Sequence, residues 1–420
     1  MSEMSDFLAT MRKVDVDQIE SALDDMWRET NVNTLTGGGV PVSRNAVMTL
    51  VIYTEDEAEA VRAMKAIESM SATHPSRCIL VTTLATYEGP PIEAFVCGRL
   101  HAEGGATSYI EQIVLEAHDG SARHLPGAVL PLILSGLPSF LWWTGEPPWK
   151  SEQFEAMVDG CDRVIVDTSE MKHGEDGLVA LEDVARRKLA NCAFSDFNWT
   201  RQQPWRELVA GFFDSQSLRD YLDGIDHLTV EYAAGPENVL PNPSAAYLFV
   251  GWLASRLNWR TERGAHGSGI DEERHHTLYS GSGQPIVVEV SARHGVPIKS
   301  WHAIVPEEAS LDGNASGVRT ISAGPACVGP GALMSVHLHA SAHGKPGTFA
   351  VARERDMRHA STLCHVPDHS LPSQTVHLPS LGESALLAEQ LQQMAHNTLY
   401  ESALTAAAHL SGLTPGRIRP

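Results

Sequence analysis

The chain has 420 residues, of which 43% are apolar and 20% are charged, a composition typical of a globular protein with two or three domains. Its net charge of −21 argues against nucleic acid and against anionic membrane surfaces as partners, because like charges repel. The first residues lack the basic segment and apolar run of a secretory signal, and no stretch is both long and apolar enough to span a bilayer. We therefore expect a cytoplasmic protein.

Strand and helix patterns alternate over the first two hundred residues. A largely helical segment is predicted at about 6–30, from apolar residues at four-residue spacing. Thr54 and Glu57 have the spacing of a capping box for a helix that runs to about Met70. Strands are predicted at 47–53, 78–83, 94–100, 109–115, 139–143 and 163–166, and further helices at 128–134, 152–158 and 178–189. This alternation predicts an α/β domain over residues 1–215, with an open, largely parallel sheet.

Two apolar helices follow in the sequence. Pro204 suits the first turn of a helix with a clean apolar face. Asn242 as the cap and Pro243 in the first turn suit a second helix, which is apolar nearly all round and must therefore be covered.

The sequence pattern changes beyond Gly264, where glycine-rich breaks separate short strand patterns. These patterns lie at 286–290, 298–305, 333–338 and 348–353, and they predict an antiparallel sheet. Ser380 and Glu383 form a capping box for one long C-terminal helix over 382–410. We therefore predict an α+β domain over 216–420, with the domain boundary between 213 and 242.

The motifs of common enzyme classes are missing from the sequence. No phosphate-binding glycine pattern follows a predicted strand, and no Gly-x-Ser-x-Gly elbow joins a strand to a helix. His337 and His339 point to the same side of a predicted strand, which can begin a metal site, but the spacing supplies no third ligand. The six cysteines are scattered, and several follow or precede apolar runs, which predicts buried free thiols. We therefore predict no catalytic, cofactor-binding or metal-binding residues.

Tryptophan is concentrated in three segments, at 141–149, 195–213 and 242–260, and the last two also contain arginine. Both residue types are enriched at the energetic centres of protein interfaces, although rings on apolar runs also fill cores. Trp142, Trp205 and Trp252 fit a core, whereas polar neighbours lead us to expect that Trp149 and Trp199 are partly exposed. Arginines 201 and 206 are either ion-pair partners of an acidic neighbour or interface donors. The candidate interface residues are Trp149, Asp196, Asn198, Trp199, Arg201 and Arg206.

Together, these three segments resemble the OpcA family, the assembly and allosteric effector proteins of glucose-6-phosphate dehydrogenase. The resemblance covers most of the chain and is strongest at 141–149, 195–214 and 243–260. It implies a non-catalytic protein without a cofactor that binds glucose-6-phosphate dehydrogenase. Such a protein promotes the active oligomer of the enzyme or raises its affinity for glucose 6-phosphate, and so favours oxidative pentose phosphate flux.

Two alternatives to this interpretation remain open. One is an enzyme with its own small-molecule site, for example for a sugar phosphate. The other is a metabolite-binding module that modulates a partner.

Some relatives in the family are linked to thioredoxin control, but this chain has no close cysteine pair near its C-terminus.

Overall fold

The computed structural model describes residues 3–36, 44, 46–70, 74–84, 90–103, 106–118, 120–236, 239–261, 268–270, 273–299, 327–367 and 369–413. The chain divides into two compact units. The first unit contains Met1–Asp167, Val184–Ser195 and Glu383–His396, and the second contains Thr168–Asp183, Asp196–Gly382 and Asn397–Pro420. A domain boundary between 213 and 242, in the sense of parts that fold independently, stays a prediction.

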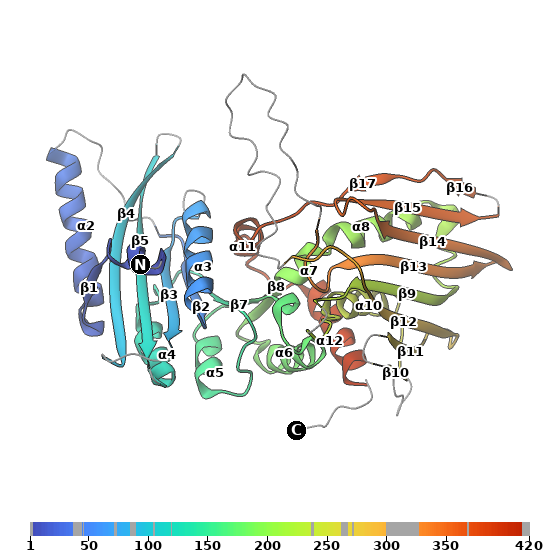
Figure 1. The fold of residues 1–420 in the computed structure, drawn as a ribbon, viewed down its shortest axis with the longest axis horizontal. Coiled ribbons are helices and arrows are strands. Elements are labelled where there is room, and N and C mark those ends of the chain that lie inside the picture. Colours follow the sequence, from blue (N-terminus) through green and yellow to red (C-terminus); the bar gives the residue numbers. More distant parts are fainter. Residues whose placement is uncertain are drawn as a thin grey trace, which may run out of the picture. The chain divides into compact units, whose positions relative to one another are not determined.

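An eight-stranded sheet organises the first unit, in the order β1-β4-β5-β3-β2-β6-β7-β8 (Figure 1). Its strands are β1 (Arg12–Val14), β2 (Thr49–Thr54), β3 (Arg77–Leu84), β4 (Ile92–Glu103), β5 (Ala106–His118), β6 (Ser139–Trp143), β7 (Arg163–Val166) and β8 (Ala193–Asp196). Neighbours from β5 through β7 pair in parallel, whereas β1 with β4 and β4 with β5 pair antiparallel. All six residues of the central strand β2 are buried, as its continuous apolar run predicts. The predicted α/β organisation with a mostly parallel sheet is confirmed.

The helices of the first unit differ in detail from the sequence patterns. They are α1 (Glu3–Leu8), α2 (Ile19–Thr36), α3 (Glu57–Met70), α4 (Leu125–Val129), α5 (Glu152–Asp159) and α11 (Glu383–Leu391). The predicted N-terminal helix is therefore interrupted by strand β1. The predicted capping box of α3 is wrong, because Thr54 donates to Val81 O between strands, and Asp56 accepts from the backbone N of Glu59 at 2.8 Å instead. Helix α6 (Gly174–Lys188) follows β7 in the chain.

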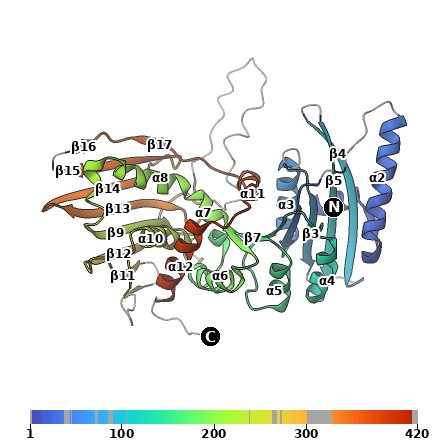
Figure 2. The same cartoon turned by 180° about the vertical axis from the view of Figure 1, so that it is seen from behind.

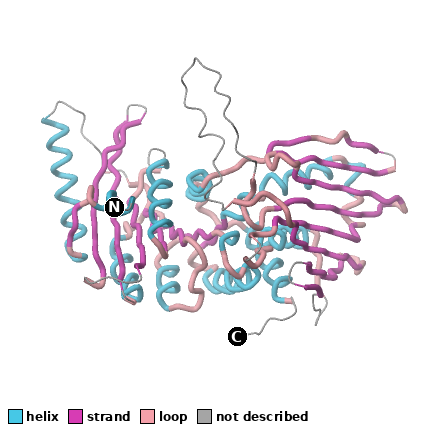
Figure 3. Tube along the Cα trace, viewed as in Figure 1, coloured by secondary structure: helices cyan, strands magenta, loops and turns pink. Residues whose placement is uncertain are grey.

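The second unit is built on a nine-stranded sheet, with its strands drawn in magenta in Figure 3. The strands are β9 (Ile225–Ala233), β10 (Ser268–Ile270), β11 (Glu273–Tyr279), β12 (Pro285–Arg293), β13 (Leu333–Ala342), β14 (Lys345–Arg353), β15 (His359–Val366), β16 (His369–Leu371) and β17 (Thr375–His377). The described pairings are antiparallel except that between β9 and β12. The predicted antiparallel sheet is therefore confirmed in the main. The predicted strand at 298–305 lies mostly outside the described residues.

Helices pack against this second sheet, as both Figure 1 and the reverse view in Figure 2 show. Helices α8 (Gln203–Gly211) and α10 (Ser244–Arg256) contact its strands, whereas α7 (Phe197–Arg201), α9 (Gln216–Arg219) and α12 (Thr398–Gly412) pack mainly on other helices of the unit. Helix α10 is buried almost all round, as predicted, and contacts α12 so closely that a Cβ at Gly251 would lie 2.3 Å from Ala403 O.

The predicted single C-terminal helix is wrong. Two helices, α11 and α12, replace it, and Asn397 begins the second by accepting from the backbone N of Tyr400 at 3.0 Å.

Candidate partner-binding surface around helices α7 and α8

Asp196 anchors the start of α7 from a position that is 1% exposed. Its carboxylate accepts hydrogen bonds from the backbone N of Asn198 at 2.9 Å and from the backbone N and hydroxyl of Thr168 at 3.0 and 2.6 Å. Asn198 Nδ2 in turn donates to Thr168 Oγ1 at 3.0 Å. These bonds fix the first turn of α7 to the short 3-10 helix η4 (Thr168–Glu170).

Asn242 holds the same 3-10 turn from the side of α10. Its Nδ2 lies within 3.1 Å of the carbonyl oxygens of Thr168, Ser169 and Met171, and its Oδ1 accepts from the backbone N and hydroxyl of Ser244. The prediction that Asn242 is the cap and that Pro243 lies in the first turn is therefore wrong: Pro243 occupies the cap position, and the Asn242 side chain ties the helix start to η4.

Trp199 is buried, so the expectation that it is partly exposed is wrong. Its exposed fraction is 5%, because Tyr400 of α12 packs on its ring, with centroids 5.6 Å apart, and Arg206 covers it. The Arg206 guanidinium carbon lies 3.6 Å from the Trp199 ring centroid, and Nη1 donates to Trp199 O at 2.8 Å. Polar neighbours in the sequence did not reveal this burial.

The structure brings five of the six candidate interface residues together, at residues 196, 198, 199, 201 and 206 of the second unit. Arg201 is half-buried and donates to Ser169 Oγ at 3.1 Å. Trp149 belongs to the first unit, where it is half-buried and packs edge-on against Phe154 at 5.6 Å. These five residues hold α7 and α8 in position. Whether any of the six contacts a partner stays a prediction.

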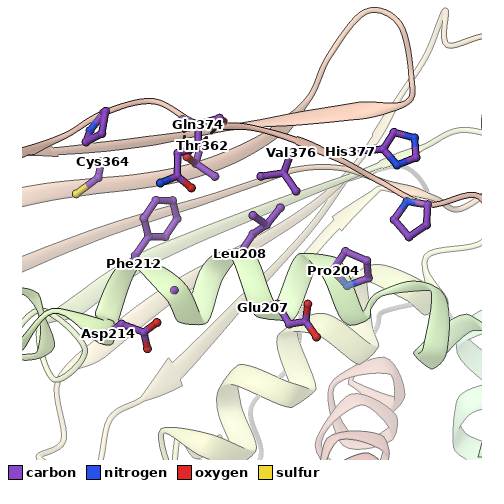
Figure 4. A pocket seen from close by; sticks show the side chains of 13 residues that line it. Pro204, Glu207, Leu208, Phe212, Asp214, Thr362, Cys364, Gln374, Val376 and His377 are labelled. Atoms are coloured by element: carbon purple, nitrogen blue, oxygen red, sulfur yellow. Dashed lines mark hydrogen bonds between the residues drawn. The ribbon is translucent and has the colours of Figure 1, made fainter.

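The outer side of α8 lines a groove of about 570 Å³ (Figure 4). Pro204, Leu208 and Phe212 contribute apolar surface from the helical wall, and Glu207 and Asp214 are exposed carboxylates on the same wall. Strand β15 and the segment around β17 form the opposite wall, with Thr362, Cys364, Gln374, Val376 and His377. Leu208 and Phe212 point towards these strands in Figure 4. Pro204 lies in the first turn of α8, as the sequence predicts.

The chemistry of this groove favours a protein segment over an anionic metabolite. Apolar surface in the centre with charged residues at the rim is the usual anatomy of a protein interface. Glu207 and Asp214 would repel a phosphate group but attract basic side chains. The groove therefore suits an apolar segment flanked by lysine or arginine.

The histidines singled out in β13 lie on the outward face of the second sheet. His339 is exposed and faces His227 of β9 across the ladder, with the ring centroids 5.9 Å apart. Within the described residues, neither His337 nor His339 belongs to a group of three side chains whose potential ligand atoms lie within 4.8 Å of one another.

The cysteines match the predicted buried free thiols. Five of the six are buried, and Cys327 is half-buried. Burial raises the pKa of Cys78 to about 11 and that of Cys192 to about 12, so both thiols are protonated near neutral pH.

Among the described residues, no helix is long and apolar enough to cross a membrane.

Two family models match this chain in order. Residues 67–184 match the glucose-6-phosphate dehydrogenase subunit N-terminal domain, and residues 192–404, about half the chain, match the C-terminal domain of the same subunit. Relatives named as a proposed OxPP cycle protein, OpcA, occur in Nostoc punctiforme and Synechococcus elongatus. The first is 28% identical over 71% of this chain and 57% of its own length, and the second is 30% identical over 44% and 40%. The chain thus spans about half the length of the curated relatives it matches.

The solved structures described here are distant from this chain in sequence. The 3-ketoreductase KijD10 from Actinomadura kijaniata aligns with 86% of this chain and 95% of its own, at 11% identity and a TM-score of 0.42. An NAD-binding protein from Listeria innocua aligns with 86% and 92%, at 12% identity and a TM-score of 0.39. Likenesses at this level support no conclusion about this chain.

Proposed function

Because the chain belongs to the OpcA family of glucose-6-phosphate dehydrogenase subunits, we propose that it is a non-catalytic effector that binds glucose-6-phosphate dehydrogenase. The ordered match of both domain models carries this proposal. The effector promotes the active oligomer of the enzyme or raises its affinity for glucose 6-phosphate, and so favours oxidative pentose phosphate flux. It acts in the cytoplasm without a cofactor of its own.

The physical requirement for such an effector is differential binding. The chain must bind the active conformation of the dehydrogenase more tightly than the inactive one, because equal binding to both leaves their equilibrium unchanged. A coupling of 1–3 kcal/mol corresponds to about a 5- to 150-fold change in substrate affinity.

We place the contact with the dehydrogenase at the groove between α8 and β15–β17. In this proposal, the buried cluster of Asp196, Trp199 and Arg206 acts as the support that holds α8 in position, and the exposed groove residues make the contact. The groove supports this placement because it lies within the segment matched by the C-terminal domain model and combines apolar surface with exposed carboxylates.

Two apolar-to-charged variants test this placement. Leu208→Glu adds a charge in the middle of the groove, and its expected effect is at least a ~30-fold loss of affinity for the purified dehydrogenase, the scale of a central interface residue. Leu363→Glu is the matched control, because Leu363 is 54% exposed on β15, between the groove residues Thr362 and Cys364 of the same strand. Affinities are measured by biolayer interferometry, with circular dichroism to verify folding.

The two variants separate the groove from the rest of the surface. Loss of binding in Leu208→Glu with normal binding in Leu363→Glu supports the groove. Equal, wild-type affinity in both would remove the groove from the interface while leaving the proposed partner untouched.

A further inference from the structure

A compact group of metal-ligating side chains lies in the first unit, far along the chain from the groove. Glu93 of β4 and Glu116 of β5 are direct cross-strand partners, and His118 follows Glu116 by two residues on the same strand. Residues two apart on a strand project from the same face of the sheet. One carboxylate oxygen from each glutamate and one imidazole nitrogen therefore gather so that all lie within 4.8 Å of one another.

All three side chains are withdrawn from solvent. The exposed fractions are 6% for Glu93, 7% for Glu116 and 3% for His118. The backbone at His118 is held in place, because its N–H donates to Pro91 O at 3.0 Å. The group is therefore a buried set of two oxygen ligands and one nitrogen ligand, unlike the acidic clusters common on protein surfaces.

The charges around this group are unbalanced. Lys13 forms an ion pair with Glu93, but 55% of its side chain is exposed to solvent. The two carboxylates of Glu93 and Glu116 are buried, whereas the ammonium that pairs with Glu93 lies on a side chain that is mostly in solvent. Buried charge of one sign is costly unless a counter-charge accompanies it.

We propose that Glu93, Glu116 and His118 bind a divalent first-row transition-metal ion, with Zn²⁺ as the representative ion. The imidazole favours such an ion over Ca²⁺ and Mg²⁺, which prefer oxygen ligands alone. Ligands at about 2.0–2.2 Å from one tetrahedral ion lie about 3.4 Å apart. The present separations of up to 4.8 Å close to that value by small side-chain rotations.

The ion has a structural role in this proposal. It joins β4 to the end of β5 and neutralises the excess negative charge beside β1, leaving one coordination position for water. Because the ligands come from the first unit, this inference is independent of the proposed partner and of the groove.

Zinc binding and thermal unfolding test the proposal on the full-length chain. Equilibrium dialysis with ZnCl₂ compares wild type with His118→Gln and with Glu116→Gln, which preserves side-chain shape. We expect each variant to lose one equivalent of tightly bound zinc, with at least a ~100-fold lower affinity at the site. His124→Gln is the control, because His124 is exposed in the same unit and outside the ligand group; its zinc binding should equal that of wild type.

Thermal unfolding separates lost metal binding from lost folding. In EDTA, Glu116→Gln should be at least as stable as wild type, because it removes the charge from one of two buried, neighbouring carboxylates. With saturating zinc, wild type should gain roughly 2–4 °C in Tm or more, and the variant should gain none. Identical zinc stoichiometry, affinity and Tm shift in wild type and both variants would overturn the proposal.

Discussion

Asn242→Asp is the most informative single substitution in the buried support of α7 and α10. The change keeps the shape of the side chain but replaces its donor, Nδ2, with an acceptor oxygen. That atom faces three backbone carbonyl oxygens at 2.9, 3.1 and 2.9 Å. The site is tightly packed, because a Cβ at Gly174 would lie only 2.2 Å from Asn242 Oδ1.

The magnitude follows from the contacts. Two protons of Nδ2 are shared among the three carbonyls, and their hydrogen bonds contribute about 1 kcal/mol each. The aspartate also buries a negative charge against carbonyl oxygens at a position that is 7% exposed. We therefore expect Asn242→Asp to lower the free energy of unfolding by about 3–5 kcal/mol.

Urea unfolding followed by tryptophan fluorescence measures this loss. Gln216→Glu is the matched control, since it makes the same amide-to-carboxylate change at an exposed position of the second unit and should change the free energy by less than about 0.5 kcal/mol. If Asn242→Asp unfolds at the same urea concentration as the control, the three carbonyl contacts contribute nothing to stability and the reasoning fails.

Two further substitutions probe other buried polar groups of the second unit. Tyr400→Phe should leave the free energy of unfolding unchanged or slightly higher in urea titrations, because the buried hydroxyl has no hydrogen-bond partner among the described residues and the ring contact with Trp199 remains; a loss above about 1 kcal/mol would show that the hydroxyl is bonded. His276 accounts for a pH dependence, because burial, aided by the charges of Arg274 and His275, lowers its pKa to about 4, while the unfolded chain takes up the proton near 6.5. Its contribution is complete above about pH 6.5 and is lost as the pH falls towards about 4, by up to about 3 kcal/mol. His276→Gln should flatten this part of the stability profile measured by urea titration at each pH, and an unchanged slope would contradict the assignment.

Local patterns predicted the elements whose surroundings are uniform. The central strand β2 is buried at every residue, so its continuous apolar run identifies it without knowledge of its neighbours. Helix α10 is apolar on nearly all sides for the same reason. Pro204 likewise identifies the start of α8, because the fixed φ and the missing N–H of proline suit the first turn of a helix, whatever surrounds it.

Features that depend on distant parts of the chain escaped prediction. The sequence predicts an exposed Trp199, because the polar residues Asn198 and Thr200 flank it. Both neighbours are themselves buried, however, and Asn198 forms hydrogen bonds inside the protein. The C-terminal helix is divided because Glu383–Leu391 packs on α3 and a new helix begins after Asn397; a capping asparagine was the available signal.

The sequence indicates only two of the three candidate metal ligands. Glu116 and His118 show the two-residue spacing of a strand face, but Glu93 joins them only through the register of β4 with β5. The groove is equally non-local, because α8 and β15–β17 are separated by more than a hundred residues. No short sequence motif indicates that such distant segments lie side by side.

A titration of this chain into the purified dehydrogenase of the same organism tests the central claim most directly. NADPH formation is followed at subsaturating glucose 6-phosphate. The account predicts a saturable rise in rate, with no turnover by this chain alone. An unchanged rate with an active dehydrogenase, or turnover by the chain without it, would contradict the effector function and favour a metabolite-binding protein or an enzyme.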